Sequence, residues 1–167
     1  MSYALLIDDD EEILRSASDL VQSQGLSLET ASSWEEGIQK FRAYSPDLVI
    51  SDYNLPGSEM GLSLLLKLAR IRPSMRLILI SGYLDEEDVA EIQALGLIHE
   101  VVRKVTPIDT ARTILKAVKE AAARADEPTD WVQFASASTG VNAIDDEAFS
   151  KLDEFLKTHR LTNGTGK

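Results

Sequence analysis

Two short apolar runs, each ending abruptly in aspartate, constrain the fold of this chain more than any other feature. Residues 4–7 (Ala-Leu-Leu-Ile) lead directly into the three aspartates at 8–10, and residues 47–51 (Asp-Leu-Val-Ile-Ser) lead into Asp52. Such runs are typical of strands buried on both faces. Open parallel sheets hold their ligands at the carboxyl ends of their strands. The sequence therefore predicts a cluster of carboxylates at one edge of a parallel sheet.

Segments with helical periodicity separate these and the other predicted strands. The strands are expected at 4–8, 27–31, 47–52, 75–81 and 99–103. The helices are expected at 11–24, in the segment that a Ser33–Glu36 capping box opens and that carries Ile38 and Phe41, at 61–71, at 86–95, and from Thr106-Pro107 to about residue 123. Strands that alternate with helices form a parallel sheet covered on both faces. We therefore predict an α/β fold with a doubly wound five-stranded parallel sheet and a short C-terminal helical extension.

The pattern changes near residue 124, which divides the chain into a domain at 1–123 and an extension at 124–167. Apolar side chains recur at helical spacing in the extension, among them Trp131, Phe134, Phe149, Leu152 and Phe155. Two interpretations of this segment stay open. Its helices pack on the domain or on one another, or they form an output segment that covers the face of the fourth and fifth helices, within one chain or in a homodimer.

Composition excludes several classes of site and partner. The chain has no cysteine, which rules out disulfides, thiol nucleophiles and thiolate zinc sites. The net charge of −11 and the lack of a basic recognition helix argue against direct binding to nucleic acid. No apolar run reaches the length that crosses a membrane, and acidic residues at position 8 are incompatible with a secretory signal. We therefore expect a cytoplasmic protein that does not bind membranes.

A cluster of carboxylates at one edge of a sheet is stabilised by a bound cation. Close carboxylates repel one another, and each raises the pKa of its neighbours, unless an opposite charge joins them. Ligand sets made only of oxygen suit Mg²⁺, which binds one or two carboxylates together with phosphate oxygens and water. The sequence therefore predicts Mg²⁺ as cofactor and chemistry on a phosphate group.

Four polar positions follow predicted strands in chain order and should meet at the same end of the sheet. These positions are Asp8-Asp9, Asp52, Ser81 and Lys104. Together with the turn Asn54-Leu55-Pro56-Gly57, they give the chain its resemblance to the receiver domain of two-component response regulators, the CheY-like family. The resemblance covers roughly residues 2–122.

The resemblance implies how the acidic residues act. Asp52 is the expected phospho-acceptor, because a carboxylate that attacks a phosphoryl group forms an acyl phosphate. Asp9, Asp52 and the main-chain carbonyl of Asn54 would bind Mg²⁺ directly. Asp8 would act on the ion through water.

The resemblance also implies how the other polar residues act. Lys104 would pair with a phosphoryl oxygen or with Asp52, and the Ser81 hydroxyl would move inward to donate to a second phosphoryl oxygen. The phosphoryl donor would be a phosphohistidine on a sensor histidine kinase or a histidine phosphotransfer protein. Such a chain is a signalling switch that catalyses only its own phosphorylation and dephosphorylation, and is not a turnover enzyme.

Two positions depart from the family pattern. Val101 stands where the family usually has an aromatic ring that follows the serine or threonine, and Val105 stands where it usually has a proline after the lysine. A cis bond before a non-proline residue costs about 2.5–4 kcal/mol, so the Lys104–Val105 bond should be trans. Tyr83, two residues after Ser81, would supply the missing ring as a switch residue together with Val101.

Two rival interpretations stay open. A phosphohydrolase similar to the haloacid dehalogenases would use Asp8 as its nucleophile, but Glu12 replaces the small hydroxyl or aliphatic residue expected there. A pseudo-receiver would keep the fold without switching, which the valines at 101 and 105 would permit.

Overall fold

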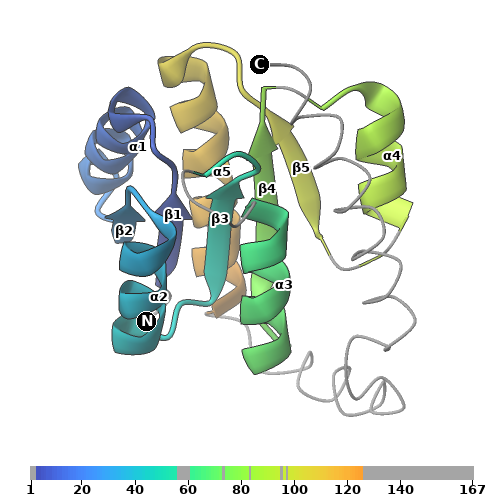
Figure 1. Ribbon diagram of the computed structural model, residues 1–167. Helices are drawn as coiled ribbons and strands as arrows, with labels where there is room; N and C mark the ends of the chain where they lie inside the picture. Colours follow the sequence, from blue (N-terminus) through green and yellow to red (C-terminus); the bar gives the residue numbers. More distant parts are fainter. Residues whose placement is uncertain are drawn as a thin grey trace.

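A parallel sheet in the strand order β2-β1-β3-β4-β5 forms the middle layer of the molecule (Figure 1). The computed structural model describes residues 3–55, 61–72, 74–82, 84–94, 96 and 98–125. The strands are β1 (Ala4–Ile7), β2 (Leu28–Ala31), β3 (Leu48–Asp52), β4 (Arg76–Ser81) and β5 (Glu100–Arg103). All neighbouring strands pair in parallel, so their carboxyl ends lie at one edge of the sheet.

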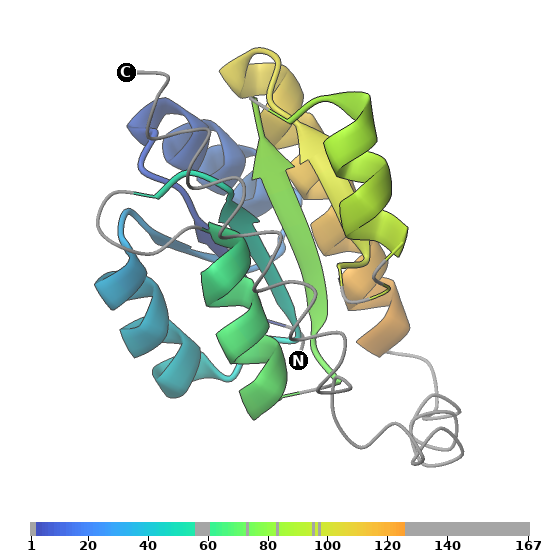
Figure 2. The same cartoon turned by 45° about the vertical axis from the view of Figure 1, so that its right-hand side comes forward.

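Helices cover both faces of the sheet, as the alternation of elements predicts. The helices are α1 (Glu11–Ser23), α2 (Trp34–Tyr44), α3 (Gly61–Ile71), α4 (Glu86–Ala94) and α5 (Pro107–Ala125). Figures 1 and 2 show α1 and α5 on one face and α2, α3 and α4 on the other. Within the ranges that the structure describes, no helix is long and apolar enough to cross a membrane.

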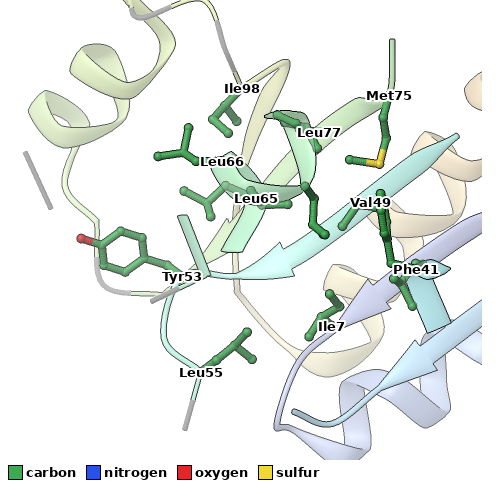
Figure 3. Packing of buried hydrophobic residues seen from close by; sticks show 14 of the residues in the cluster. Ile7, Phe41, Val49, Tyr53, Leu55, Leu65, Leu66, Met75, Leu77 and Ile98 are labelled. Atoms are coloured by element: carbon green, nitrogen blue, oxygen red, sulfur yellow. The ribbon is translucent and has the colours of Figure 1, made fainter. Parts of the chain in front are cut away.

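Two hydrophobic clusters fill the space between the sheet and its helices, one on each face. The side chains of β1 alternate between them: Leu5 and Ile7 join the cluster under α2, α3 and α4, whereas Leu6 packs toward α1 and α5. Figure 3 shows the first cluster, in which Ile7 lies near Phe41 of α2. Because β1 is buried on both faces, its first polar residue appears only where the strand ends.

One close contact fixes α2 against β1. A Cβ atom added to Gly37 would lie 2.7 Å from Cδ1 of Ile7, closer than side-chain atoms approach without moving. Gly37 therefore lets the helix approach the residue that immediately precedes Asp8.

The predicted element boundaries are confirmed to within two residues. Capping accounts for several of them: the Asp10 side chain accepts hydrogen bonds from the first turn of α1, and α5 begins at Pro107 after the Thr106 cap. The capping box of α2 differs in one arm. Ser33 Oγ accepts from Glu36 N at 3.2 Å, but the Glu36 carboxylate accepts from Ser32 N rather than from Ser33 N.

The end of α5 lies two residues beyond the expected boundary at 123, at Ala125. The predicted helices of the extension fall at 126–167, which lie outside the described residues, as does Tyr83.

Candidate functional site

The register of the sheet brings the polar residues at the strand ends together. Ile7 pairs with Ser51, and Asp52 pairs with Ile80. Asp8, which directly follows β1, and Ser81, the last residue of β4, therefore lie on either side of the end of β3. The ladder continues one residue past β5, since Lys104 N donates to Ser81 O at 3.0 Å.

Lys104 joins the ends of the first, third and fifth strands through its ammonium group. Nζ lies 2.8 Å from Oδ2 of Asp52 and donates a 3.1 Å hydrogen bond to Oδ1 of Asp8. The same nitrogen lies 2.9 Å from Oδ2 of Asp8, an ionic approach without hydrogen-bond geometry. One cation thus neutralises part of the charge of two carboxylates that are 52 and 96 residues away in the chain.

Asp9 completes an acidic cluster with the two buried carboxylates. One oxygen atom from each of Asp8, Asp9 and Asp52 lies within 4.8 Å of the others. Asp8 and Asp52 are 0% and 4% exposed, whereas Asp9 faces solvent. The buried Oδ2 of Asp8 accepts no hydrogen bond from the described residues, so it retains free lone pairs. These oxygen donors fit a hard divalent cation such as Mg²⁺, with an entry from the solvent side.

Main-chain amides fix the orientation of both buried carboxylates. Asp10 N donates to Oδ1 of Asp8 at 2.9 Å, and Asn54 N donates to Oδ1 of Asp52 at 3.1 Å. Both bonds link a side chain to the amide two residues further on, the local geometry that aspartate favours where a strand turns into a loop. The sequence that ends each strand therefore also holds its carboxylate in place.

Burial dominates the titration of the site. Desolvation by burial, followed by the charge of Asp8, raises the pKa of Asp52 to about 7, although the hydrogen bond from Lys104 opposes both effects. The pKa of Asp8 is raised as well, again mainly by burial. Burial alone would lower the pKa of Lys104, but its hydrogen bonds to Asp52 and Asp8 outweigh this effect and raise it. The lysine therefore stays protonated, and its single positive charge does not compensate both carboxylates.

The remaining candidate residues occupy different surroundings. Ser81 is 2% exposed at the end of β4, one residue beyond the register partner of Asp52. Asn54 is half-buried at the turn after β3. Val101 is half-buried and packs against the cluster under α2, α3 and α4. The described residues contain no cis peptide bond, so Lys104–Val105 is trans, as the sequence predicts.

Sequence reasoning missed two buried polar side chains near the site. Tyr53 directly follows Asp52, and its side chain belongs to the cluster under α2, α3 and α4. Burial there and the charge of Asp88 raise the pKa of Tyr53 to about 12. Thr110 is 1% exposed on α5, and its hydroxyl accepts a hydrogen bond from Val105 N. A threonine within the apolar stripe of the last helix was the available signal for the second residue.

Comparison with known proteins decides the family. The family model of the response regulator receiver domain matches residues 4–119. The chain belongs to the response regulator receiver family. Receiver domains are signalling domains of two-component systems that accept a phosphoryl group on aspartate, and they are not classical enzymes. The resemblance seen in the sequence is thereby confirmed.

Solved receiver domains share the fold over nearly their whole length. A CheY-like receiver from Methanospirillum hungatei is 27% identical, with a TM-score of 0.60 over 74% of this chain and 98% of that chain. A receiver from Clostridium thermocellum is 30% identical, with a TM-score of 0.58 over 72% and 96%.

Curated relatives are longer proteins. The nitrate/nitrite response regulator protein NarL of Escherichia coli is 32% identical over 71% of this chain and 54% of its own length. The transcriptional regulatory protein GlrR of Escherichia coli is 26% identical over 75% of this chain and 28% of its own. The chain thus spans from about a quarter to about half the length of these relatives.

Proposed function

We propose that this receiver accepts a phosphoryl group on Asp52 from a sensor histidine kinase or a histidine phosphotransfer protein, in a reaction that depends on Mg²⁺. The observation that carries this proposal is the position of Lys104 Nζ, which lies within 3.1 Å of both Asp8 and Asp52 at an acidic cluster. Phosphoryl transfer requires positioning and neutralisation of charge more than proton chemistry. A buried acid, a fixed ammonium and an oxygen-rich cation site meet these requirements.

Each group has a defined part in the transfer. A carboxylate oxygen of Asp52 attacks phosphorus, the bond from phosphorus to the donor imidazole breaks, and the imidazole nitrogen leaves with the electron pair. Lys104 then pairs with an oxygen of the transferred group. Asp9, Asp52 and the main-chain carbonyl of Asn54 would hold Mg²⁺, with Asp8 acting through water, and the bound ion would supply neutralisation of the phosphate charge.

Phosphorylation adds charge at the end of β3, and the adjacent strand carries the response. The hydroxyl of Ser81 donates to a second phosphoryl oxygen and moves inward to reach it. Val101 and Tyr83 serve as the switch residues that transmit this shift. Val101 packs against the cluster under α2, α3 and α4. Because its side chain is small, the shift of Ser81 changes the packing around Val101, where an aromatic residue at this position would rotate its ring.

The domain at 1–123 is the phospho-acceptor, and the segment at 124–167 is a dimerisation or output segment. The helix α5 contains residues 124 and 125, the first two of this segment, and this continuity supports a mechanical link between the two parts. Deletion of residues 126–167 tests the link, and an unchanged oligomeric state together with unchanged phosphorylation kinetics would refute it. We expect no direct binding of nucleic acid by this chain. Of the longer relatives, NarL is named a nitrate/nitrite response regulator protein and GlrR a transcriptional regulatory protein.

Labelling with acetyl phosphate and Mg²⁺ tests the acceptor. Wild-type protein and Asp47→Asn, a control at the other end of β3, should gain one phosphoryl group by intact-mass measurement, whereas Asp52→Asn should gain none. Labelling that persists in Asp52→Asn and disappears in Asp8→Asn would support the phosphohydrolase instead. A Mg²⁺-dependent spectral change on addition of beryllofluoride would argue against the pseudo-receiver.

A further inference from the structure

The turn between β5 and α5 contains a hydrogen bond that fixes the main chain immediately after Lys104. Val105 N donates to Oγ1 of Thr110 at 3.3 Å. The Val105 residue is 76% exposed, but the hydroxyl that receives its N–H belongs to a side chain that is 1% exposed. The turn is therefore tied to the interior of the molecule through its backbone.

This bond is the second of two anchors at the base of the lysine. The first is the bond from Lys104 N to Ser81 O at 3.0 Å, which extends the sheet ladder. The main chain of Lys104 is thus attached to β4 on one side and, through the next peptide, to α5 on the other. A lysine stem has many rotamers, so a fixed base restricts the region that its ammonium group can reach.

The Thr110 hydroxyl lies among apolar side chains, which favours its hydrogen bond with the Val105 amide. Thr110 lies in the first turns of α5, on the same buried stripe as Ala111 and Ile114. A hydroxyl among apolar side chains requires a partner, and the Val105 amide is the partner that the structure shows. The amide exists only because residue 105 is not proline, which has no N–H.

We propose that Thr110 is a positioning residue for Lys104, acting through the Val105 amide to hold the ammonium group between Asp8 and Asp52. This inference rests on the proposed function, because it assigns Thr110 to the phosphoryl transfer at Asp52. Thr110 itself touches neither the acids nor the transferred group.

Substitution of the hydroxyl tests the proposal. Thr110→Val removes the acceptor at nearly constant volume and should lower the rate constant of labelling by acetyl phosphate roughly two- to tenfold, the range for one lost hydrogen bond. Thr110→Ser should restore the rate to within about twofold. The matched control is Thr113→Val on the same helix, which removes a hydroxyl that donates to Asp109 O and should leave the rate unchanged.

Substitution of the donor tests the route through Val105. In a Val105→Pro background the amide is absent, so adding Thr110→Val should cause no further loss of rate. A further loss in that background would overturn the route. Equal rates for wild type and Thr110→Val, or an equal loss in Thr113→Val, would overturn the positioning role.

A spectroscopic measurement separates this proposal from the proposed function. The ¹H–¹⁵N signal of the Lys104 ammonium group should be protected by its two carboxylates in wild type and in Thr110→Ser, and should broaden toward that of an exposed lysine in Thr110→Val. If wild-type protein is not labelled at Asp52, the proposed function fails while this signal still reports on Lys104. An unchanged Lys104 signal in a folded Thr110→Val protein would overturn the inference by itself.

Discussion

The two ends of the sheet treat their charges in opposite ways. At the amino end, Asp47 pairs with Arg72 at 2.9 Å, and both side chains keep roughly a third or more of their surface exposed. Arg72 also donates to main-chain carbonyls, Pro46 O at 2.9 Å and Ser45 O. At the carboxyl end, Asp8 and Asp52 are buried and share a single lysine. The Asp47–Arg72 pair is balanced in charge and partly exposed, while the carboxyl end has an excess of buried negative charge.

This contrast separates stability from function. The amino end contains further side-chain to main-chain bonds, such as that of Leu77 N, which donates to Nδ1 of His99 at 3.0 Å, although the buried Nε of Arg76 has no hydrogen-bond partner among the described residues. The carboxyl end retains a carboxylate oxygen without a hydrogen-bond donor among the described residues, together with two acids of raised pKa. Such an arrangement costs folding free energy, and it is consistent with the proposed binding of a cation and a phosphoryl group at this end.

Removal of the cation at the carboxyl end should have the largest effect. Lys104→Ala leaves two buried carboxylates without a positive partner, which should lower the free energy of unfolding by about 3 kcal/mol. It should also reduce the rate of acetyl phosphate labelling by about 100-fold, since a charge-assisted contact to the transferred group is lost. Denaturant unfolding and intact-mass kinetics measure the two effects. If Lys104→Ala were labelled at the wild-type rate, the lysine would contribute only to the stability of the fold.

Addition of a divalent cation should partly correct the imbalance at the carboxyl end. Mg²⁺ at 100 times its dissociation constant should raise the free energy of unfolding by about 2.7 kcal/mol, because it binds the folded state only. Thermal unfolding at several Mg²⁺ concentrations measures this effect. Asp9→Asn should reduce the gain, whereas Asp47→Asn should not. An equal gain in Asp9→Asn would remove Asp9 from the site.

Removal of one acid should stabilise the protein in a way that depends on pH. The pKa of Asp52 is about 7 in the folded protein, against an ordinary value of 3.8 for an aspartate side chain. The folded state therefore holds this proton more tightly, and the stabilising contribution is complete at low pH and lost as the pH rises from about 4 through 7.

Asp52→Asn should consequently exceed wild type in stability by about 2 kcal/mol at pH 8 without divalent cations. The advantage should shrink toward pH 5, where wild-type Asp52 is protonated. Urea unfolding at both pH values measures the difference. An advantage that grows as the pH falls would contradict the raised pKa.

Substitution at the amino end should have the smallest effect. Arg72→Ala removes a partly exposed ion pair and its hydrogen bonds to main-chain carbonyls, which should cost about 1 kcal/mol of stability. Acetyl phosphate labelling should proceed at the wild-type rate. A labelling defect in a folded Arg72→Ala protein would show that the two ends are coupled, and the comparison between them would no longer hold.

The sequence predicted the sheet and the convergence of the acids because both follow from local patterns. The apolar runs define the strands, and the first polar residue after each run marks the rim. The contact of Lys104 with Asp52 required only the correct strand order, which short connections and alternating elements constrain strongly, whereas its contact with Asp8 was not predicted.

Other features could not be predicted because they depend on the side-chain geometry of the folded state. The Glu36 carboxylate binds Ser32 N instead of Ser33 N, a choice between adjacent amides that spacing does not distinguish. The bond from Val105 to Thr110 depends on the path of one turn. The pKa of Asp52 depends on its burial, which the pattern of strands does not quantify.

The close approach of Gly37 to Ile7 limits how this domain can be redesigned. The outer surface of α2 is open to new side chains, and a library could randomise its exposed positions to recruit a different protein. A methyl group at position 37 would instead require the side chain of Ile7 to move, in the core directly beside the start of the acidic cluster. Remodelling of that helix for a new recognition task is therefore best confined to its outer positions.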